Sequence, residues 1–135
     1  MNQDPAILYV EDDPMSRRVM EFVLKYRMKL SNITMFEESS DFQTRVGTLT
    51  PRPDVVFLDI HMKPYSGFEM LEILRNIEQY RHIPVVALTA SVMNEEVAMM
   101  RTAGFDGCFA KPLDVDMFEN NFVSILKGEQ VWSIA

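Results

Sequence analysis

Short continuous apolar runs alternate along the chain with segments whose apolar residues recur at helical spacing. Three of the runs are rich in β-branched residues: Ala6–Val10, Val55–Leu58 and Pro84–Leu88. Runs of this length are typical of strands that are buried on both faces of a parallel sheet. Two shorter apolar runs predict an edge strand at Ile33–Phe36 and a further strand at Cys108–Ala110.

The segments between these runs are expected to be helices. Apolar residues at positions i, i+3, i+4 and i+7 mark one face of a helix in an early segment: Val19, Phe22, Val23 and Tyr26. A similar face recurs near the C-terminus at Phe118, Phe122 and Ile125. Residue types that favour helix N-termini stand before or at the start of the helical segments, at Asp13-Pro14, Ser66 with Glu69, Asn94 and Asp114. Gly104 and Gly128 are placed to end helices.

The alternation of strands and helices predicts one α/β fold. Five strands and five helices in this order form a doubly wound parallel sheet, for which we expect the strand order 2-1-3-4-5. A length of 135 residues suits one domain and is too short for two. We therefore expect a single domain over residues 1–135, with its core at about residues 5–128 and no output module.

Composition restricts the class of partner. The net charge of −7 disfavours binding to nucleic acid. The apolar runs are too short to cross a bilayer, and the N-terminus lacks the features of a secretory signal. A single cysteine, Cys108, fits a reducing compartment. We expect a cytoplasmic protein that binds small ions, phosphoryl groups and other proteins.

Polar residues follow the predicted strands at the edge where parallel sheets bind ligands. Glu11 and Asp12 follow the first strand, Asp59 the third, Thr89 the fourth and Lys111 the fifth. Each has an ordinary alternative explanation, as a solvated loop acid, a helix cap, a strand end or a surface lysine. Their joint occurrence at successive strand ends favours a shared site, because the strand order 2-1-3-4-5 brings the acids of the first and third strands together.

Such a cluster predicts phosphoryl chemistry. Two carboxylates about 4 Å apart repel each other by roughly 4 kcal/mol at an effective dielectric constant near 20, and a hard divalent cation relieves this repulsion. Mg²⁺ suits a small set of carboxylates better than Ca²⁺ or Zn²⁺. Asp59 could then act as a nucleophile that forms an acyl phosphate. Mg²⁺, Lys111 and the Thr89 hydroxyl would neutralise charge on the transferred group.

Over nearly its whole length the chain resembles the receiver domain of two-component response regulators, a chemotaxis-regulator-like family with a flavodoxin-like fold. The resemblance is carried by motifs in order along the chain: Ile7–Asp13, Val56–Met62, Gly67, Leu88–Ala90 and Gly107–Pro112. It implies that a histidine kinase or a histidine phosphotransfer protein phosphorylates Asp59, and that a downstream protein reads the result. Self-catalysed phosphorylation and dephosphorylation are the only catalysis it implies.

The resemblance also assigns the ligands and the moving parts. Asp12 and Asp59 would ligate Mg²⁺, or Mn²⁺ in its place, with Glu11 acting through water and the backbone carbonyl of His61 contributing. Thr89 would move to hydrogen-bond the phosphoryl group, Lys111 would pair with it, and the Lys111-Pro112 peptide would be cis. Phosphorylation is expected to change a protein-binding surface or to supply an onward phosphorelay. A monomer or a weak homodimer is expected.

Two departures from the family pattern stand out. Lys63 occupies the position of the usual proline, with Pro64 one residue later, which predicts a local change of loop shape. Cys108 occupies the position of the usual switch tyrosine or phenylalanine. Because Phe109 should point to the opposite face of the strand, the usual aromatic coupling is in question. Near the C-terminus, Trp132 and Ile134 are expected either to anchor a partner or a dimer or to lie in a frayed tail.

Three other functions fit the sequence less well than the receiver. A haloacid-dehalogenase-like phosphohydrolase would need an aspartate two residues after Asp59, where His61 stands. A pseudo-receiver would keep the fold without phosphorylation, but it would be marked by substituted acids or a missing lysine. Nucleotide binding at the same edge would need a glycine-rich loop after the first strand, which this sequence lacks there.

Overall fold

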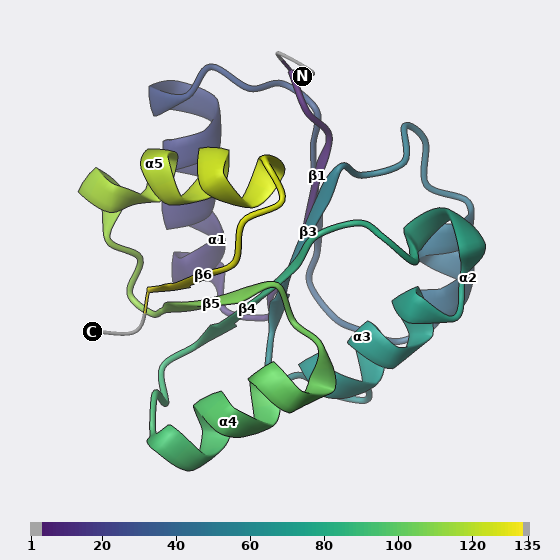
Figure 1. The fold of residues 1–135 in the computed structure, drawn as a ribbon. Coiled ribbons are helices and arrows are strands. Elements are labelled where there is room, and N and C mark those ends of the chain that lie inside the picture. The colour runs from purple at the N-terminus through teal and green to yellow at the C-terminus, as the bar shows by residue number, and fades with distance from the viewer. Residues whose placement is uncertain (1–3, 134–135) are drawn as a thin grey trace.

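The computed structural model describes residues 4–133 and contains a parallel sheet with the strand order β2-β1-β3-β4-β5-β6 (Figure 1). The strands are β1 (Ile7–Val10), β2 (Ile33–Phe36), β3 (Val55–Asp59), β4 (Val85–Thr89), β5 (Gly107–Ala110) and β6 (Val131–Ser133). The predicted order of the first five strands is confirmed, with β2 at one edge. The prediction of five strands was incomplete, because β6 adds a sixth beside β5.

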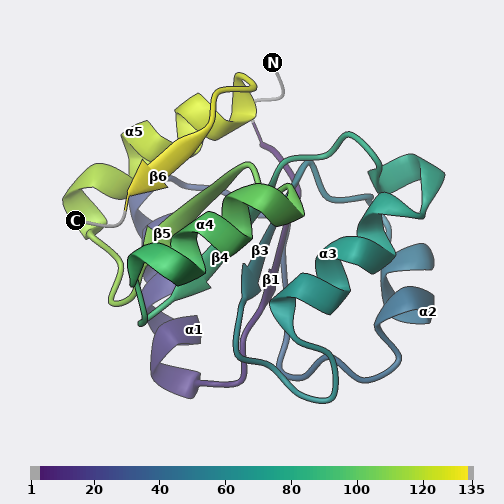
Figure 2. The same ribbon diagram turned by 60° about the horizontal axis from the view of Figure 1, so that its bottom comes forward.

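Helices cover both faces of the sheet. They are α1 (Pro14–Glu21), which continues as the π-helix η1 (Phe22–Arg27), then α2 (Phe42–Gly47), α3 (Gly67–Arg75), the 3₁₀-helix η2 (Glu78–Tyr80), α4 (Asn94–Ala103) and α5 (Val115–Leu126). Figures 1 and 2 show α1 and α5 on one face and α2, α3 and α4 on the other. None of the helices within residues 4–133 has the length and apolar character needed to span a membrane.

Alternate strand residues build a separate apolar core on each face. Tyr9, Phe57 and Phe109 point toward α1 and α5, where the Phe57 ring lies 5.9 Å from the Phe118 ring and 6.1 Å from the Phe122 ring. Cys108 points to the opposite core, under α2, α3 and α4. The expectation that Cys108 and Phe109 face opposite sides is confirmed, and the two-sided burial explains why the central strands are continuously apolar.

Most of the predicted helix caps are present. Asp13 accepts the Ser16 backbone N–H at 2.9 Å, and Asp114 caps α5. Ser66 and Glu69 form a reciprocal capping box at the start of α3. Asn94 does not cap α4, because the N-cap residue is Met93 and Asn94 is already helical.

The apolar face predicted for the first helix is confirmed at Val23, which is buried, but is wrong at Phe22 and Tyr26. Phe22 and Tyr26 are 50% and 56% exposed, whereas the buried residues of this segment are Met20, Val23 and Leu24. The helix changes to π geometry at Phe22, and the Met28 N–H bonds to the Val23 carbonyl five residues back. This spacing differs from that of an α-helix, so a strict α-helical pattern does not describe the buried face.

Strand β6 occupies the edge of β5 at very close range. A Cβ on Gly107 would lie 2.2 Å from the Val131 carbonyl oxygen, so only glycine permits this approach. Trp132 pairs with Cys108 across the two strands, and its ring lies 4.2 Å from the Arg101 guanidinium carbon of α4. Trp132 is therefore part of the sheet, which extends beyond the expected core limit at residue 128. Ile134 lies outside the described residues.

Candidate functional site

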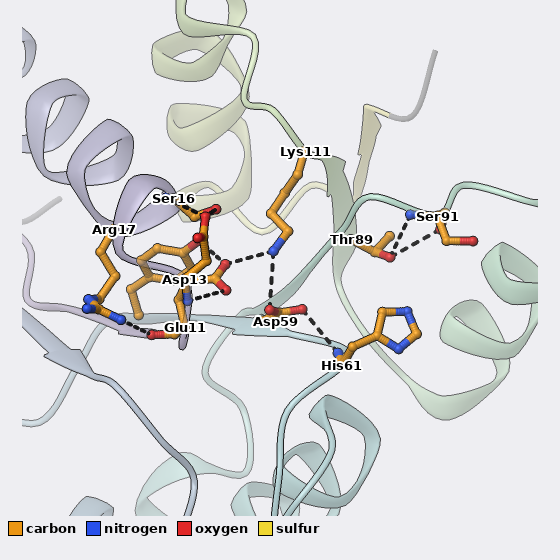
Figure 3. A network of polar contacts seen from close by, with 10 residues as sticks. Glu11, Asp13, Ser16, Arg17, Asp59, His61, Thr89, Ser91 and Lys111 are labelled. Carbon is orange, nitrogen blue, oxygen red and sulfur yellow. Dashed lines mark hydrogen bonds and ion pairs between the residues drawn. The ribbon is translucent and has the colours of Figure 1, made fainter.

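The predicted site residues meet at the carboxyl ends of four neighbouring strands (Figure 3). Asp59 is the last residue of β3 and Thr89 the last of β4, while Glu11 and Lys111 directly follow β1 and β5. The parallel order places all four ends at one edge of the sheet. This is the arrangement that the sequence predicts.

Lys111 connects two carboxylates. Its Nζ atom lies 2.9 Å from Glu11 Oε1 and 3.2 Å from Asp59 Oδ2. The Glu11 side chain is fully buried, and the Asp59 side chain is only 6% exposed. Burial acts to lower the pKa of Lys111, but the two carboxylates outweigh it, so the pKa of Lys111 is raised. Lys111 therefore stays protonated and supplies a positive charge at the centre of the site.

Asp59 is oriented by its backbone surroundings as well as by Lys111. Its Oδ1 atom accepts the His61 backbone N–H at 3.0 Å. Figure 3 shows the His61 ring pointing away from the Asp59 carboxylate. Gly67 at the start of α3 passes close behind, since an added Cβ would lie 2.9 Å from the Asp59 carbonyl oxygen. The β3–α3 loop thus closes around the base of Asp59.

The acids form a group that fits a hard cation. Glu11, Asp12 and Asp59 each offer one carboxylate oxygen, and these oxygens lie within 4.8 Å of one another. Asp12 is exposed, so solvent reaches this side of the cluster. An all-oxygen set with an open side matches Mg²⁺, which usually retains several of its water ligands. The residues present therefore fit the ion that the sequence predicts.

Glu11 is held by more partners than the sequence indicated. Its Oε1 atom accepts the Tyr9 hydroxyl at 2.6 Å in addition to Lys111, and its Oε2 atom accepts the Asp13 backbone N–H at 3.3 Å. Burial and the nearby Asp59 raise the pKa of Glu11, while the bonds from Tyr9 and Lys111 oppose this rise. Arg17 also bonds to the Glu11 backbone carbonyl at 2.9 Å (Figure 3).

Sequence reasoning missed Tyr9 and Arg17. The contact of Tyr9 with Glu11 was predictable, because residues two apart on a strand point to the same face and Tyr9 precedes Glu11 by two. Arg17 had none, since its contact depends on how the β1–α1 loop turns.

Thr89 lies near the site but bonds elsewhere. Its hydroxyl accepts the Ser91 backbone N–H at 3.0 Å and donates to the Ser91 carbonyl at 3.2 Å. Thr89 is fully buried at the end of β4. Figure 3 shows this pair on the far side of Asp59 from Glu11. The hydroxyl is therefore available to a group on Asp59 only if its bonds to the β4–α4 loop change.

Cis peptide bonds occur in two loops at this edge of the sheet. Lys111-Pro112 is cis, as the resemblance implied, and so is Lys63-Pro64 at the departure from the family pattern.

A cavity of about 390 Å³ adjoins the site between α1 and the β5–α5 loop. Its lining is mostly apolar and includes Tyr9, Met15, Val19, Lys111, Pro112 and Leu113.

Comparison with known proteins agrees with this geometry. The profile of the response regulator receiver domain matches residues 7–122. The chain is 35% identical over 75 residues to the polar-differentiation response regulator DivK of Brucella anthropi. That match covers 56% of this chain and 61% of DivK, so it spans less than two thirds of the relative.

Solved structures show the same fold. The receiver domain of a DNA-binding response regulator from Colwellia psychrerythraea is 25% identical, with a TM-score of 0.80, and the match covers 92% of this chain and 99% of that one. The receiver domain of a sensor histidine kinase from Pseudomonas aeruginosa is 22% identical, with a TM-score of 0.79, over 91% of this chain and 98% of that one. That structure holds a magnesium ion in its active-site cleft. With the family profile matching most of its length, this chain belongs to the response regulator receiver domain family.

Proposed function

We propose that this receiver accepts a phosphoryl group on Asp59 from a phosphohistidine of a histidine kinase or a histidine phosphotransfer protein. The observation that carries the proposal is the placement of the Asp59 carboxylate 3.2 Å from Lys111 Nζ, within the group of acids formed with Glu11 and Asp12. A nucleophile, a lysine cation and a cluster of metal-binding oxygens thus share one edge of the sheet. This combination suits phosphoryl transfer, in which positioning and charge neutralisation do most of the work.

The transfer is a displacement at phosphorus. A carboxylate oxygen of Asp59 forms the new P–O bond while the P–N bond to the donor histidine breaks, and the histidine nitrogen keeps the electron pair of that bond. Lys111 moves from the carboxylates toward the phosphoryl oxygens and offsets their charge. Asp12, Asp59 and the His61 backbone carbonyl would hold Mg²⁺, or Mn²⁺ in its place, with Glu11 acting through water, and the ion would supply further positive charge.

Thr89 links the acceptor to α4. We propose that the Thr89 hydroxyl leaves Ser91 and bonds to the phosphoryl group, which pulls on the loop that begins α4 at Asn94. Phosphorylation would then shift an existing equilibrium of the face formed by α4, β5 and α5. A downstream protein would read that face, or the phosphoryl group would pass onward to another histidine.

The exposed side of α1 and η1 is the proposed approach for the donor. Met15, Phe22 and Tyr26 are 61%, 50% and 56% exposed, and the Phe22 and Tyr26 rings lie 6.3 Å apart, so adjacent apolar groups face solvent there. Met15 also lines the cavity beside the site. A partner helix lying on this surface would bring its phosphohistidine toward Asp59.

Expectations for catalysis, domain extent, location and oligomeric state complete the proposal. The only catalysis is the receiver's own phosphorylation and dephosphorylation. We expect a single receiver domain over residues 1–135 that acts in the cytoplasm, as a monomer or a weak homodimer.

The experiment is incubation with acetyl phosphate or phosphoramidate, in Mg²⁺ or in excess chelator, followed by intact-mass measurement. Wild type should gain one phosphoryl group in Mg²⁺ only, and Asp59→Asn should gain none. The matched control is Asp13→Asn, because Asp13 serves as a helix cap and asparagine caps equally well. An equal gain in Asp59→Asn would reject Asp59 as the acceptor. Lack of any gain in wild type would favour a pseudo-receiver, and sustained release of inorganic phosphate from small esters would favour a phosphohydrolase.

A further inference from the structure

Tyr9 places a hydroxyl against the acidic site from inside the core. Its oxygen lies 2.6 Å from Glu11 Oε1, and both side chains are fully buried. We propose that Tyr9 is a positioning residue that holds Glu11 in place when Lys111 moves to the phosphoryl group. The proposal rests on the proposed function and adds a residue to it.

The Tyr9 ring is buried in the core, and its hydroxyl donates to Glu11. Tyr9 lies in the middle of β1, and its ring belongs to the apolar core beneath α1 and α5. A phenylalanine ring would fill this space equally well, whereas a buried tyrosine hydroxyl requires a partner. That partner is Glu11, two residues along and on the same face of the strand.

Glu11 Oε1 is shared between two donors, of which only one can move. Lys111 divides its ammonium group between Glu11 and Asp59. Tyr9, by contrast, is held by the surrounding core and stays where it is. A phosphoryl group on Asp59 draws Lys111 away from Glu11, which would leave a buried carboxylate without one of its donors. The Tyr9 hydroxyl and the Asp13 N–H remain on Glu11 and reduce the cost of this transfer.

A purely structural role predicts something different. If the hydroxyl only satisfied its own hydrogen bond, Tyr9→Phe would alter stability without altering the site. If it compensates for the loss of Lys111, the variant should bind Mg²⁺ nearly normally but should bind a phosphoryl mimic poorly. The reason is that only the mimic requires Lys111 to leave Glu11.

Tyr80 supplies a matched control. It is a second buried tyrosine, and its hydroxyl donates to the Val46 carbonyl at 2.6 Å, on the other face of the sheet. Tyr80→Phe removes a buried hydroxyl and its hydrogen bond without touching the acidic site. Comparing Tyr9→Phe with Tyr80→Phe therefore separates the effect on the site from the general effect of losing a buried hydrogen bond.

The experiment measures two affinities for wild type, Tyr9→Phe and Tyr80→Phe. Calorimetry gives the affinity for Mg²⁺ alone, and titration in saturating Mg²⁺ gives the affinity for beryllium fluoride. We expect Tyr9→Phe to weaken beryllium fluoride binding about tenfold, as the loss of one hydrogen bond to a charged group would. Its Mg²⁺ affinity should change by less than about threefold, a smaller change because Lys111 stays on Glu11. Both affinities of Tyr80→Phe should match wild type.

Equal beryllium fluoride affinity in wild type and Tyr9→Phe would overturn the role of Tyr9, and so would an equal loss in Tyr80→Phe. Unfolding curves for both variants show whether the loss follows the site or the overall stability. Failure of the proposed function looks different, because wild type itself would then bind no beryllium fluoride.

Discussion

Lys111 Nζ lies 3.2 Å from Asp59 Oδ2, although β4 separates β3, which ends in Asp59, from β5, which Lys111 follows. The lysine side chain reaches across the end of β4 and continues to Glu11 beyond. It therefore neutralises the same carboxylates that would hold a metal ion. Lys111 and a divalent cation would therefore neutralise the same cluster of negative charge, so each reduces the attraction of the cluster for the other.

Replacing Lys111 should separate metal binding from phosphorylation. Lys111→Met keeps much of the side-chain volume and removes the charge. Mg²⁺ affinity should rise about threefold or more, because a cation that repels the ion has gone. Phosphorylation of Asp59 should nevertheless fall at least about tenfold, since the positive charge that Lys111 brings to the phosphoryl oxygens is lost. Calorimetry and intact-mass time courses measure the two effects, and a parallel fall in both would contradict this account.

Gly107 should be required for β6 to pair closely with β5. Gly107→Ala would put a Cβ 2.2 Å from the Val131 carbonyl oxygen, so the two strands must separate. We expect a loss of about 1–3 kcal/mol in the free energy of unfolding. The fluorescence of Trp132, the single tryptophan of the chain, should shift to longer wavelength as its ring is exposed.

Gly47→Ala is the control for this change. Gly47 ends α2, and an added Cβ there would meet nothing within 4 Å. Its stability should stay the same or rise by roughly 0.5–1 kcal/mol. Equal destabilisation of the two variants would show that the close approach of β6 is not the cause.

Trp132 should also report the state of Asp59. The Trp132 ring lies 4.2 Å from Arg101 of α4, and the loop that begins α4 is bonded to Thr89. Beryllium fluoride with Mg²⁺ should therefore change Trp132 fluorescence in wild type. Thr89→Ala should lose most of this change while still binding Mg²⁺. An unchanged signal in wild type would mean that α4 does not move relative to β6.

Cys108 should make stability fall at alkaline pH. Burial raises the pKa of the Cys108 thiol from 9.0 to about 11. The folded state thus keeps its proton where the unfolded state loses it, so this contribution to stability is complete below pH 9 and is lost as the pH rises through about 11. The contribution amounts to about 2–3 kcal/mol. Denaturant unfolding at a series of pH values should show a steeper decline for wild type than for Cys108→Ala, and equal slopes would refute the assignment.

The fold and the main site residues were predictable because they follow from short-range patterns. Buried central strands must be continuously apolar, and the carboxyl ends of parallel strands share one edge. These two facts are enough to predict from the sequence that Asp59, Thr89 and Lys111 lie together. The capping residues Asp13, Ser66 and Asp114 were equally predictable from the sequence, because a cap and its helix are adjacent in sequence.

Features that depend on contacts distant in sequence could not be predicted. Strand β6 is only three residues long, and it is recognisable only once Gly107 is known to leave room for it. The π-helical geometry after Phe22 similarly displaced an apolar face that regular spacing had predicted. Cys108 stands where the family usually has an aromatic residue. Its partner on the adjacent strand is Trp132, whose side chain packs against the same core as Cys108.

The central claim is that Asp59 carries the phosphoryl group, and its most direct test is to locate that group. Wild type is phosphorylated with acetyl phosphate in Mg²⁺, reduced with borohydride, which converts an aspartyl phosphate to homoserine, and mapped by peptide mass spectrometry. We predict homoserine at position 59 alone, with none at positions 12 or 13. Homoserine at another aspartate, with position 59 unmodified, would contradict the account.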